Sequence, residues 1–199
     1  SDLPYRWSNF YDINTQQDAY VINIQSGEQK LITKALKGDV FISPKGNYVY
    51  WYSQTDTAWF SYAINNAQTH SLTKSLPVAF ADEEDDHPDY PAAYGRLGWT
   101  EQDQQLLVYD RYDIWSLDPE NKRAAINLTK MGRNQKIVFR YIRLDPEEKF
   151  IKADAQLLLS AFNELTKTTG FYRLNLKTNE LKKLLVGDYR YAGVVKALQ

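Results

Sequence analysis

One short pattern occurs four times along the sequence, and this repeat limits the possible folds more than any other feature. In each copy an aromatic residue begins a strand that runs into a polar turn. A second short strand follows and ends on an apolar residue, in most copies with threonine after it. The copies begin at Tyr20, Phe60, Trp115 and Tyr172 and end at Thr33, Thr73, Thr129 and Leu184. Repeats of this length bury their hydrophobic faces only against their neighbours, so the pattern favours a series of similar sheets.

Two further strands precede the aromatic strand in three of the repeats. The first, with its polar turn, covers 39–47, 97–103 and 141–148, and the second covers 48–53, 105–110 and 157–163. In the turn Ser43-Pro44-Lys45-Gly46, proline presets φ and glycine accepts a positive φ. Four short antiparallel strands per repeat form the blade of a propeller. The sequence therefore predicts an all-β fold, a partial or small β-propeller of about four blades of four-stranded antiparallel sheets.

We expect a single propeller segment over residues 1–199. Its parts are an incomplete blade at 5–34, blades at about 38–74, 95–130 and 138–186, and an orphan strand at 189–199. The spacing from Thr33 to Thr73 fits a bare blade, whereas the wider spacing from Thr73 to Thr129 implies an insertion. We place that insertion at 77–94 and a second one near 147–155.

The two ends of the chain do not coincide with blade boundaries. Residues 5–34 supply what we interpret as second, third and fourth strands, at 5–11, 19–24 and 29–33, without a first strand. Residues 190–196 are interpreted as a first strand with nothing after it. Because unsatisfied strand edges favour association, we expect the tail to pair with the N-terminal strands, within the molecule or across a homodimer.

Composition excludes several classes of function. The formal net charge is −1 and no lysine or arginine cluster is present, so nothing points to nucleic acid. No apolar run approaches the roughly 18 residues that a membrane span needs. The absence of cysteine excludes disulfides, thiolate metal sites and a cysteine nucleophile.

The sequence opens at Ser1 without a methionine, and we expect it to be an excised piece without its targeting segment. Asn127 begins a glycosylation sequon, which we interpret as the Leu-Thr ending of a repeat.

Five segments carry a resemblance to a known family: Pro4-Tyr5-Arg6-Trp7, the turn at 43–46, and residues 98–100, 109–115 and 139–148. Together they resemble the propeller of bacterial prolyl oligopeptidase and dipeptidyl-peptidase-type serine peptidases, in particular the large Bacteroides-like members. The resemblance covers nearly the whole chain. It implies a periplasmic or secreted parent enzyme in which an α/β-hydrolase domain hydrolyses peptides through a serine acyl-enzyme. The propeller would filter and orient the peptide substrate.

No catalytic residue of that family can be assigned in this chain. There is no Gly-x-Ser-x-Gly nucleophile elbow, and the only histidines are His70 and His87. A catalytic triad needs a base held beside an exposed nucleophile and oriented by a carboxylate, and we identify no such triad around either histidine. We therefore expect no catalytic site, no cofactor and no enzymatic activity in this chain.

The densest run of chemically active side chains covers residues 82–89, where six carboxylates surround His87. Clustered oxygens suit Ca²⁺, but the spacing is not that of a calcium loop and no glycine supplies its sharp turn. Dipeptidyl peptidases bind the free amino terminus of a substrate through paired glutamates in a propeller insertion. By this resemblance Glu83 and Glu84 could instead bind such an amino group, through ammonium–carboxylate hydrogen bonds that are short and strong. We favour a solvated acidic loop, keep amine binding as the second interpretation, and assign no metal.

Arginine and aromatic side chains offer two further candidates. Arg111, Arg140 and Arg143 lie on or beside the expected strands, where their forks could bind a substrate carboxylate. We favour pairing between blades with Asp110, Asp113 or Asp145, and keep Arg111 and Arg140 as candidate substrate-binding residues. The following aromatic residues could stack on a ligand, but their repeat register favours a core between sheets: Trp51, Trp59, Trp99, Trp115 and Tyr172.

The sequence thus predicts a non-catalytic propeller segment of a serine peptidase, which gates peptide substrate for an α/β-hydrolase domain of the parent chain. The main alternative is a stand-alone WD-like propeller that binds protein or glycan without a hydrolase partner. A glycan hydrolase would need two carboxylates converging at the central channel, and the sequence gives no way to place them there.

Overall fold

The computed structural model describes residues 1–11, 15–191 and 193–197. Strands dominate this part of the chain, and its helices have three or four residues each. The chain divides into two compact units. The first holds Ser1–Ala93 and Pro119–Lys122, and the second holds Tyr94–Asp118 and Arg123–Gln199.

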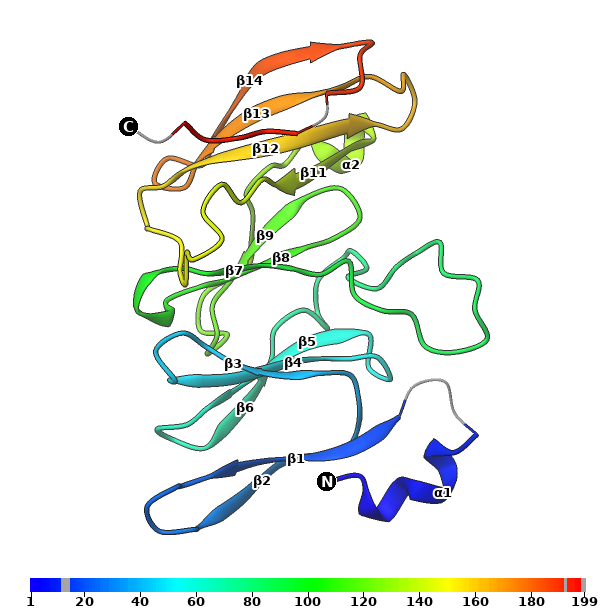
Figure 1. Ribbon diagram of the computed structural model, residues 1–199, viewed down its shortest axis with the longest axis vertical. Coiled ribbons are helices and arrows are strands. Elements are labelled where there is room, and N and C mark those ends of the chain that lie inside the picture. Colours follow the sequence, from blue (N-terminus) through cyan, green and yellow to red (C-terminus); the bar gives the residue numbers. More distant parts are fainter. Residues whose placement is uncertain (12–14, 192, 198–199) are drawn as a thin grey trace. The chain divides into compact units, whose positions relative to one another are not determined.

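Three four-stranded sheets account for most of the structure (Figure 1). In the first unit the sheet comprises β3 (Val40–Ile42), β4 (Tyr48–Ser53), β5 (Ala58–Ala63) and β6 (Gln68–Ser71). The second unit holds β7 (Arg96–Trp99), β8 (Leu106–Tyr109), β9 (Ile114–Leu117) and β10 (Ile126–Asn127), followed by β11 (Ile137–Tyr141), β12 (Gln156–Asn163), β13 (Thr169–Asn175) and β14 (Glu180–Gly187).

Every strand in these sheets pairs antiparallel with its neighbour in sequence, so each sheet is a meander. Four-stranded antiparallel meanders of this kind are the blades of propellers. The all-β, propeller-like fold class predicted from the repeat is confirmed. The three sheets lie in the ranges 38–74, 95–130 and 138–186 that the sequence assigned to whole blades, with β11 and β14 each extending one residue beyond the last range.

The two sheets of the second unit share one hydrophobic core. Leu107 and Ile114 from the first sheet and Phe139 and Leu159 from the next belong to a single cluster of buried side chains. Each of these four is fully buried. Because a sheet of short strands exposes two faces, packing against the next sheet removes one face from water and stabilises both sheets.

The repeated threonine has a defined structural task. Thr73 and Thr129 follow the fourth strand of their sheets, and both are buried. The Thr73 hydroxyl accepts the backbone N–H of Trp59 at 2.9 Å, and the Thr129 hydroxyl accepts that of Ile114 at 3.1 Å. The Thr129 hydroxyl also donates to Asp113 at 2.6 Å. In these two sheets the hydroxyl therefore extends the pairing of the third and fourth strands beyond the last backbone bond.

The repeated asparagine stabilises the turn between the same two strands. Asn23 Oδ1 accepts the backbone N–H groups of Gln25 and Ser26, at 2.9 and 3.2 Å. Asn175 accepts those of Lys177 and Thr178 at the same two distances. A short side-chain acceptor that bonds the backbone two residues on makes such a turn, which explains why the first and last repeats match most closely here.

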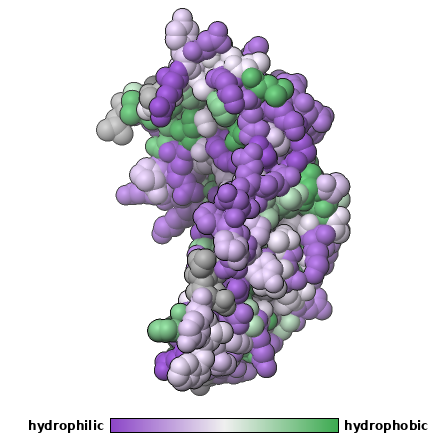
Figure 2. Space-filling model, turned by 90° about the vertical axis from the view of Figure 1, so that its right-hand side faces the viewer, coloured by the Kyte–Doolittle hydropathy of each residue, from purple (hydrophilic) through white to green (hydrophobic). Residues whose placement is uncertain are grey.

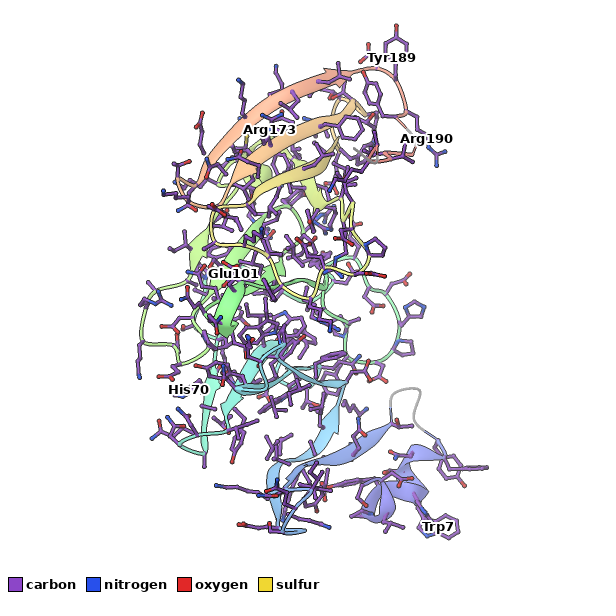
Figure 3. All side chains as sticks on the ribbon, turned by 60° about the vertical axis from the view of Figure 1, so that its left-hand side comes forward. Trp7, His70, Glu101, Arg173, Tyr189 and Arg190 are labelled. Atoms are coloured by element: carbon purple, nitrogen blue, oxygen red, sulfur yellow. The ribbon has the colours of Figure 1, made fainter. Side chains whose placement is uncertain are left out.

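The prediction of a strand at residues 5–11 is wrong. This segment forms a single 3₁₀ turn, η1 (Leu3–Tyr5), followed by the short helix α1 (Arg6–Asn9). Pro4 lies in the first turn, where its fixed φ favours a helix and its missing N–H costs nothing. The Asn9 side chain then bonds both the N–H and the C=O of Gln16, at 2.7 and 2.9 Å. Trp7 points away from the ribbon and is 87% exposed (Figure 3).

The first sheet consequently has two strands among the described residues, β1 (Gln16–Ile22) and β2 (Gln29–Lys37). Its inner face packs on the neighbouring sheet of the first unit through Val21 and Ile32, which contact the buried cluster around Trp51 and Tyr62. Lys30 also places its ammonium 5.9 Å from the ring centroid of Tyr62.

The first strand expected in the tail is also not formed. No strand occurs in residues 188–191 and 193–197. The Thr169 hydroxyl instead donates to the backbone carbonyl of Tyr189, and the Tyr191 ring lies 5.5 Å from that of Phe171. Aromatic contacts with β13 thus hold the described start of the tail on its own sheet.

We predict that Thr129→Val lowers the free energy of unfolding by about 2 kcal/mol, because it leaves the buried Ile114 N–H without its acceptor. Urea unfolding measures this difference. Thr33 holds the same repeat position in β2, and its hydroxyl makes no hydrogen bond within the described structure. Thr33→Val is therefore the matched control, expected to change the free energy by less than about 0.5 kcal/mol. Equal losses in the two variants would contradict the role given to the hydroxyl.

Candidate functional site

The acidic insertion is a long loop of the first unit between β6 and the second unit. A β-bridge between Ala81 and Ala93 closes its neck, and the Asp82 N–H donates to the Ala92 carbonyl at 2.8 Å. Glu83 and Glu84 lie beyond this neck and are exposed. The face of the molecule drawn in Figure 2 is largely hydrophilic. The solvated acidic loop favoured from the sequence matches this exposure, and the neck keeps its two ends together.

Asp85, Asp86 and His87 come together at the tip of the insertion. One ligand atom from each lies within 4.8 Å of the others, and all three residues are exposed. His87 Nδ1 lies 2.6 Å from Asp85 Oδ1. Hydrogen bonds from the His87 backbone and then from its ring lower the pKa of Asp85 below its usual value. This histidine–carboxylate contact was not predicted from the sequence. Exposed carboxylates with their bonds inside one loop do not by themselves make a metal site.

A groove of about 620 Å³ lies beside the second half of the same loop. Its lining residues are Tyr11, Lys37, His87, Pro88, Asp89, Tyr90 and Pro91. Lys37 Nζ lies 3.4 Å from Asp89 Oδ1, and these side chains are only 9% and 12% exposed. The Lys37 ammonium also lies 5.3 Å from the centroid of the Tyr90 ring. The only lysine in the lining is thus engaged by a carboxylate and an aromatic ring, whereas Glu83, Glu84 and Asp86 of the loop are exposed.

The second unit places Arg111 beside Glu164. Arg111 follows β8, and Glu164 lies in the turn after β12. Arg111 Nη2 bonds the two carboxylate oxygens at 3.0 and 3.1 Å, and Nε bonds one of them at 3.3 Å. The Tyr112 hydroxyl donates to the same carboxylate at 2.8 Å. Pairing between blades was predicted correctly. The carboxylate bound by Arg111 is that of Glu164, in the corresponding turn of the next sheet, and the aspartate partners named in the prediction were wrong.

Three cations surround the Tyr112 ring. The guanidinium carbons of Arg111 and Arg133 lie 5.1 and 5.3 Å from the ring centroid, and Lys136 Nζ lies 5.0 Å from it. Arg133 and Lys136 come from α2 (Gly132–Gln135) and the residue after it. Neither residue was predicted from the sequence, because α2 lies in a connection that the repeat does not cover.

Asp110 is fully buried beneath this cluster. Its Oδ1 accepts the backbone N–H groups of Tyr112 and Asp113, both at 2.6 Å, and its Oδ2 accepts the Trp115 indole N–H at 3.1 Å. Burial raises the pKa of Asp110, although these hydrogen bonds oppose the shift. Arg133 Nη2 lies 3.6 Å from the carboxylate. Asp110 therefore organises the turn between β8 and β9.

Arg140 holds the same turn from β11. Its guanidinium donates to the backbone carbonyls of Phe139 and Arg111, at 2.8 and 3.2 Å, and packs 4.7 Å from the centroid of the Tyr109 ring. Burial lowers the pKa of Arg140 below its usual value. Arg143 likewise donates to the Leu97 carbonyl at 3.2 Å. These arginines bond backbone groups of neighbouring strands, which is a structural use.

The candidate residues from the sequence therefore fall into two groups. Glu83 and Glu84 lie on an exposed loop of the first unit, whereas Arg111 and Arg140 lie in a bonded network of the second. The predicted aromatic core residues are buried, with exposed fractions of 2–8%: Trp51, Trp59, Trp99, Trp115 and Tyr172. His70 lies on β6, as expected from its place in the closing strand.

We predict that Glu164→Gln lowers the free energy of unfolding by about 1 kcal/mol at pH 7. Burial, the largest effect, raises the pKa of Glu164, but hydrogen bonds from Tyr112 and Arg111 and the charges of Arg111 and Lys136 outweigh it, so the pKa is lowered. A lowered carboxyl pKa stabilises the folded state above the usual glutamate value near 4.3, and this contribution is lost as the pH falls through the lowered value.

The difference between parent and Glu164→Gln should therefore shrink as the pH falls from 7 to 3, as measured by urea unfolding. Glu180→Gln, at an exposed position in β14, serves as the control and should show no such trend. A difference that stays constant over this range would contradict the assigned network.

Among the described residues, no helix has both the length and the apolar character needed to cross a bilayer. No protein-family model matches the sequence, and no curated protein does. Among solved structures the chain is similar to oligogalacturonate lyase in complex with manganese, with 9% identity and a TM-score of 0.34. The match covers 85% of this chain and 59% of that one. At this distance the likeness carries no argument about the site.

Proposed function

We propose that this chain is a non-catalytic propeller segment that admits and orients peptides for an α/β-hydrolase domain of a prolyl oligopeptidase-type serine peptidase. The observation that carries the proposal is the acidic insertion, which the repeat of four-stranded sheets presents to solvent on a closed neck. The sequence resemblance supplies the identity of the hydrolase partner and the periplasmic or secreted location.

The chemistry of the insertion favours a ligand that carries a positive charge. Five exposed or half-buried carboxylates lie on residues 82–86, and the sole lysine of the adjoining groove is bonded to Asp89. A peptide with a free amino terminus supplies such a charge together with backbone groups that could lie in the groove. Glu83 and Glu84 are the residues assigned to the ammonium group, because charged hydrogen bonds between ammonium and carboxylate are the strong ones.

The arginine network takes a supporting part in this proposal. Arg111 and Arg140 bond Glu164 and backbone carbonyls and so fix the turn between β8 and β9. A ligand carboxylate would have to displace those partners. We therefore propose that the insertion makes the first contact with the peptide. The arginines make the second unit rigid.

We predict that a peptide with a free amino terminus binds at least tenfold more tightly than its N-acetylated form, because acetylation removes the charge that the carboxylates bind. Isothermal titration calorimetry at low ionic strength measures the ratio. The double variant Glu83→Gln, Glu84→Gln should bring the ratio close to one. The chain contains another adjacent glutamate pair, so Glu147→Gln, Glu148→Gln is the control and should preserve it. Equal binding of the two peptides by the parent chain would refute the amine site.

The non-catalytic part of the proposal has its own test. Incubation of the chain with prolyl and dipeptide chromogenic substrates should release no product above background. Turnover that a serine-directed inhibitor abolishes would overturn this part. Binding of peptides regardless of their amino terminus, without any turnover, would favour the stand-alone binding propeller instead.

A further inference from the structure

The two-stranded sheet of the first unit has an edge that the described chain covers only in part. β1 pairs with β2 on one side. On its other side, Asp18 and Ser1 exchange backbone hydrogen bonds, with Asp18 N–H donating to Ser1 O at 2.7 Å. The Asn9 side chain bonds Gln16 on the same side. The second half of β1 carries no such cover in the described structure.

Alternation along β1 identifies the open backbone groups. Asp18 directs its N–H and C=O away from β2, whereas the Asn23 N–H points across the hairpin to the Glu28 carbonyl at 2.9 Å. Residues of even number in this strand therefore face the outer edge, since backbone groups alternate in an antiparallel strand. The N–H and C=O groups of Tyr20 and Ile22 are thus directed outward and make no backbone bond there with any described residue.

This edge also lacks the usual protection. Sheets avoid uncontrolled pairing through lysine or proline on the edge strand. β2 carries Lys30, Lys34 and Lys37, but β1 has no lysine, arginine or proline. The outer face beside the open edge is apolar, with Tyr20 41%, Ile22 53% and Leu31 39% exposed. The sheet therefore has an edge suited to accept one more strand, and that edge is on the β1 side.

We propose that this edge is occupied by β1 of a second copy of the chain, in antiparallel register about a two-fold axis at Val21. In that register Tyr20 pairs with Ile22 of the second copy, and Ile22 pairs with its Tyr20. Each pair exchanges two backbone hydrogen bonds, so the outward groups of both residues are satisfied. The joined sheet has the strand order β2–β1–β1–β2. It therefore has four strands, as many as each of the other sheets among the described residues.

Self-complementarity favours a second copy over an unrelated strand. The same surface meets itself about the axis, which is the requirement for a two-fold interface. The aromatic Tyr20 lies beside the β-branched Ile22 of the other copy on one face, and such cross-strand pairs stabilise sheets. Because only two pairs of residues exchange backbone hydrogen bonds, the interface is small. We therefore expect a dissociation constant in the micromolar range.

Sedimentation velocity over about 1–200 µM protein tests the association. We expect a concentration-dependent dimer, and Ile22→Lys should weaken it at least tenfold by placing a charge on the shared edge. Ile126→Lys is the control, because Ile126 is an apolar strand residue of similar exposure, at 42%. A monomer at every concentration would overturn the proposal. So would a dimer that responds to Trp7→Ala but not to Ile22→Lys.

A disulfide test locates the axis. The chain contains no cysteine, so Val21→Cys introduces a single thiol. Residues opposite each other in a non-hydrogen-bonded antiparallel pair have Cα atoms about 4.5 Å apart, within the range that a disulfide spans. We expect mild oxidation to cross-link Val21→Cys into a covalent dimer and to leave the control Ile126→Cys largely monomeric. Equal cross-linking of the two variants, with folding verified by circular dichroism, would refute the register.

Discussion

Burial between successive short sheets is the constraint on which the structure depends. The strands have between two and nine residues, too few to stabilise an isolated sheet in water. In the second unit one core joins residues of two sheets, from Leu97 to Leu174. In the first unit the two-stranded sheet packs in the same way, on the cluster around Trp51 and Tyr62. Each sheet therefore needs a neighbour, and local features such as the buried threonine hydroxyls fix how its strands end.

The sequence predicted the sheets well, because strands and turns leave a local signature. Alternating aromatic residues predicted the strands β4 and β5. The Asn23 and Asn175 side chains accept backbone hydrogen bonds within their own turns, so these turns are also a local feature of the sequence. The failures are contacts that local patterns do not record. Residues 5–11 carry aromatic side chains suited to a strand, yet Pro4 and the contact of Asn9 with Gln16 select a helical turn. Similarly, Glu164 lies 53 positions from its partner Arg111, and no spacing rule links them.

The candidate site was predictable only in its composition. The acidic run was evident from the sequence. Its exposure to solvent could be expected, because charged side chains are rarely buried and these residues have no apolar neighbours that would be buried with them. The ion pair of Lys37 with Asp89 was not foreseen, because it joins the end of β2 to a loop whose path depends on tertiary contacts. Charge is consequently divided between two uses. Glu83, Glu84 and Asp86 of the insertion are exposed to water, whereas the arginines of the second unit are engaged by Glu164 and by backbone carbonyls.

The closed neck of the insertion has a consequence for how this loop can change. The Ala81–Ala93 bridge joins the two ends of the loop to each other, and the Lys37–Asp89 pair holds its second half on β2 of the first unit. A cut in the exposed tip between them would separate the backbone without releasing either half. The tip is therefore a place where residues can be exchanged, lengthened or replaced by a foreign peptide at little expense to the sheets beneath.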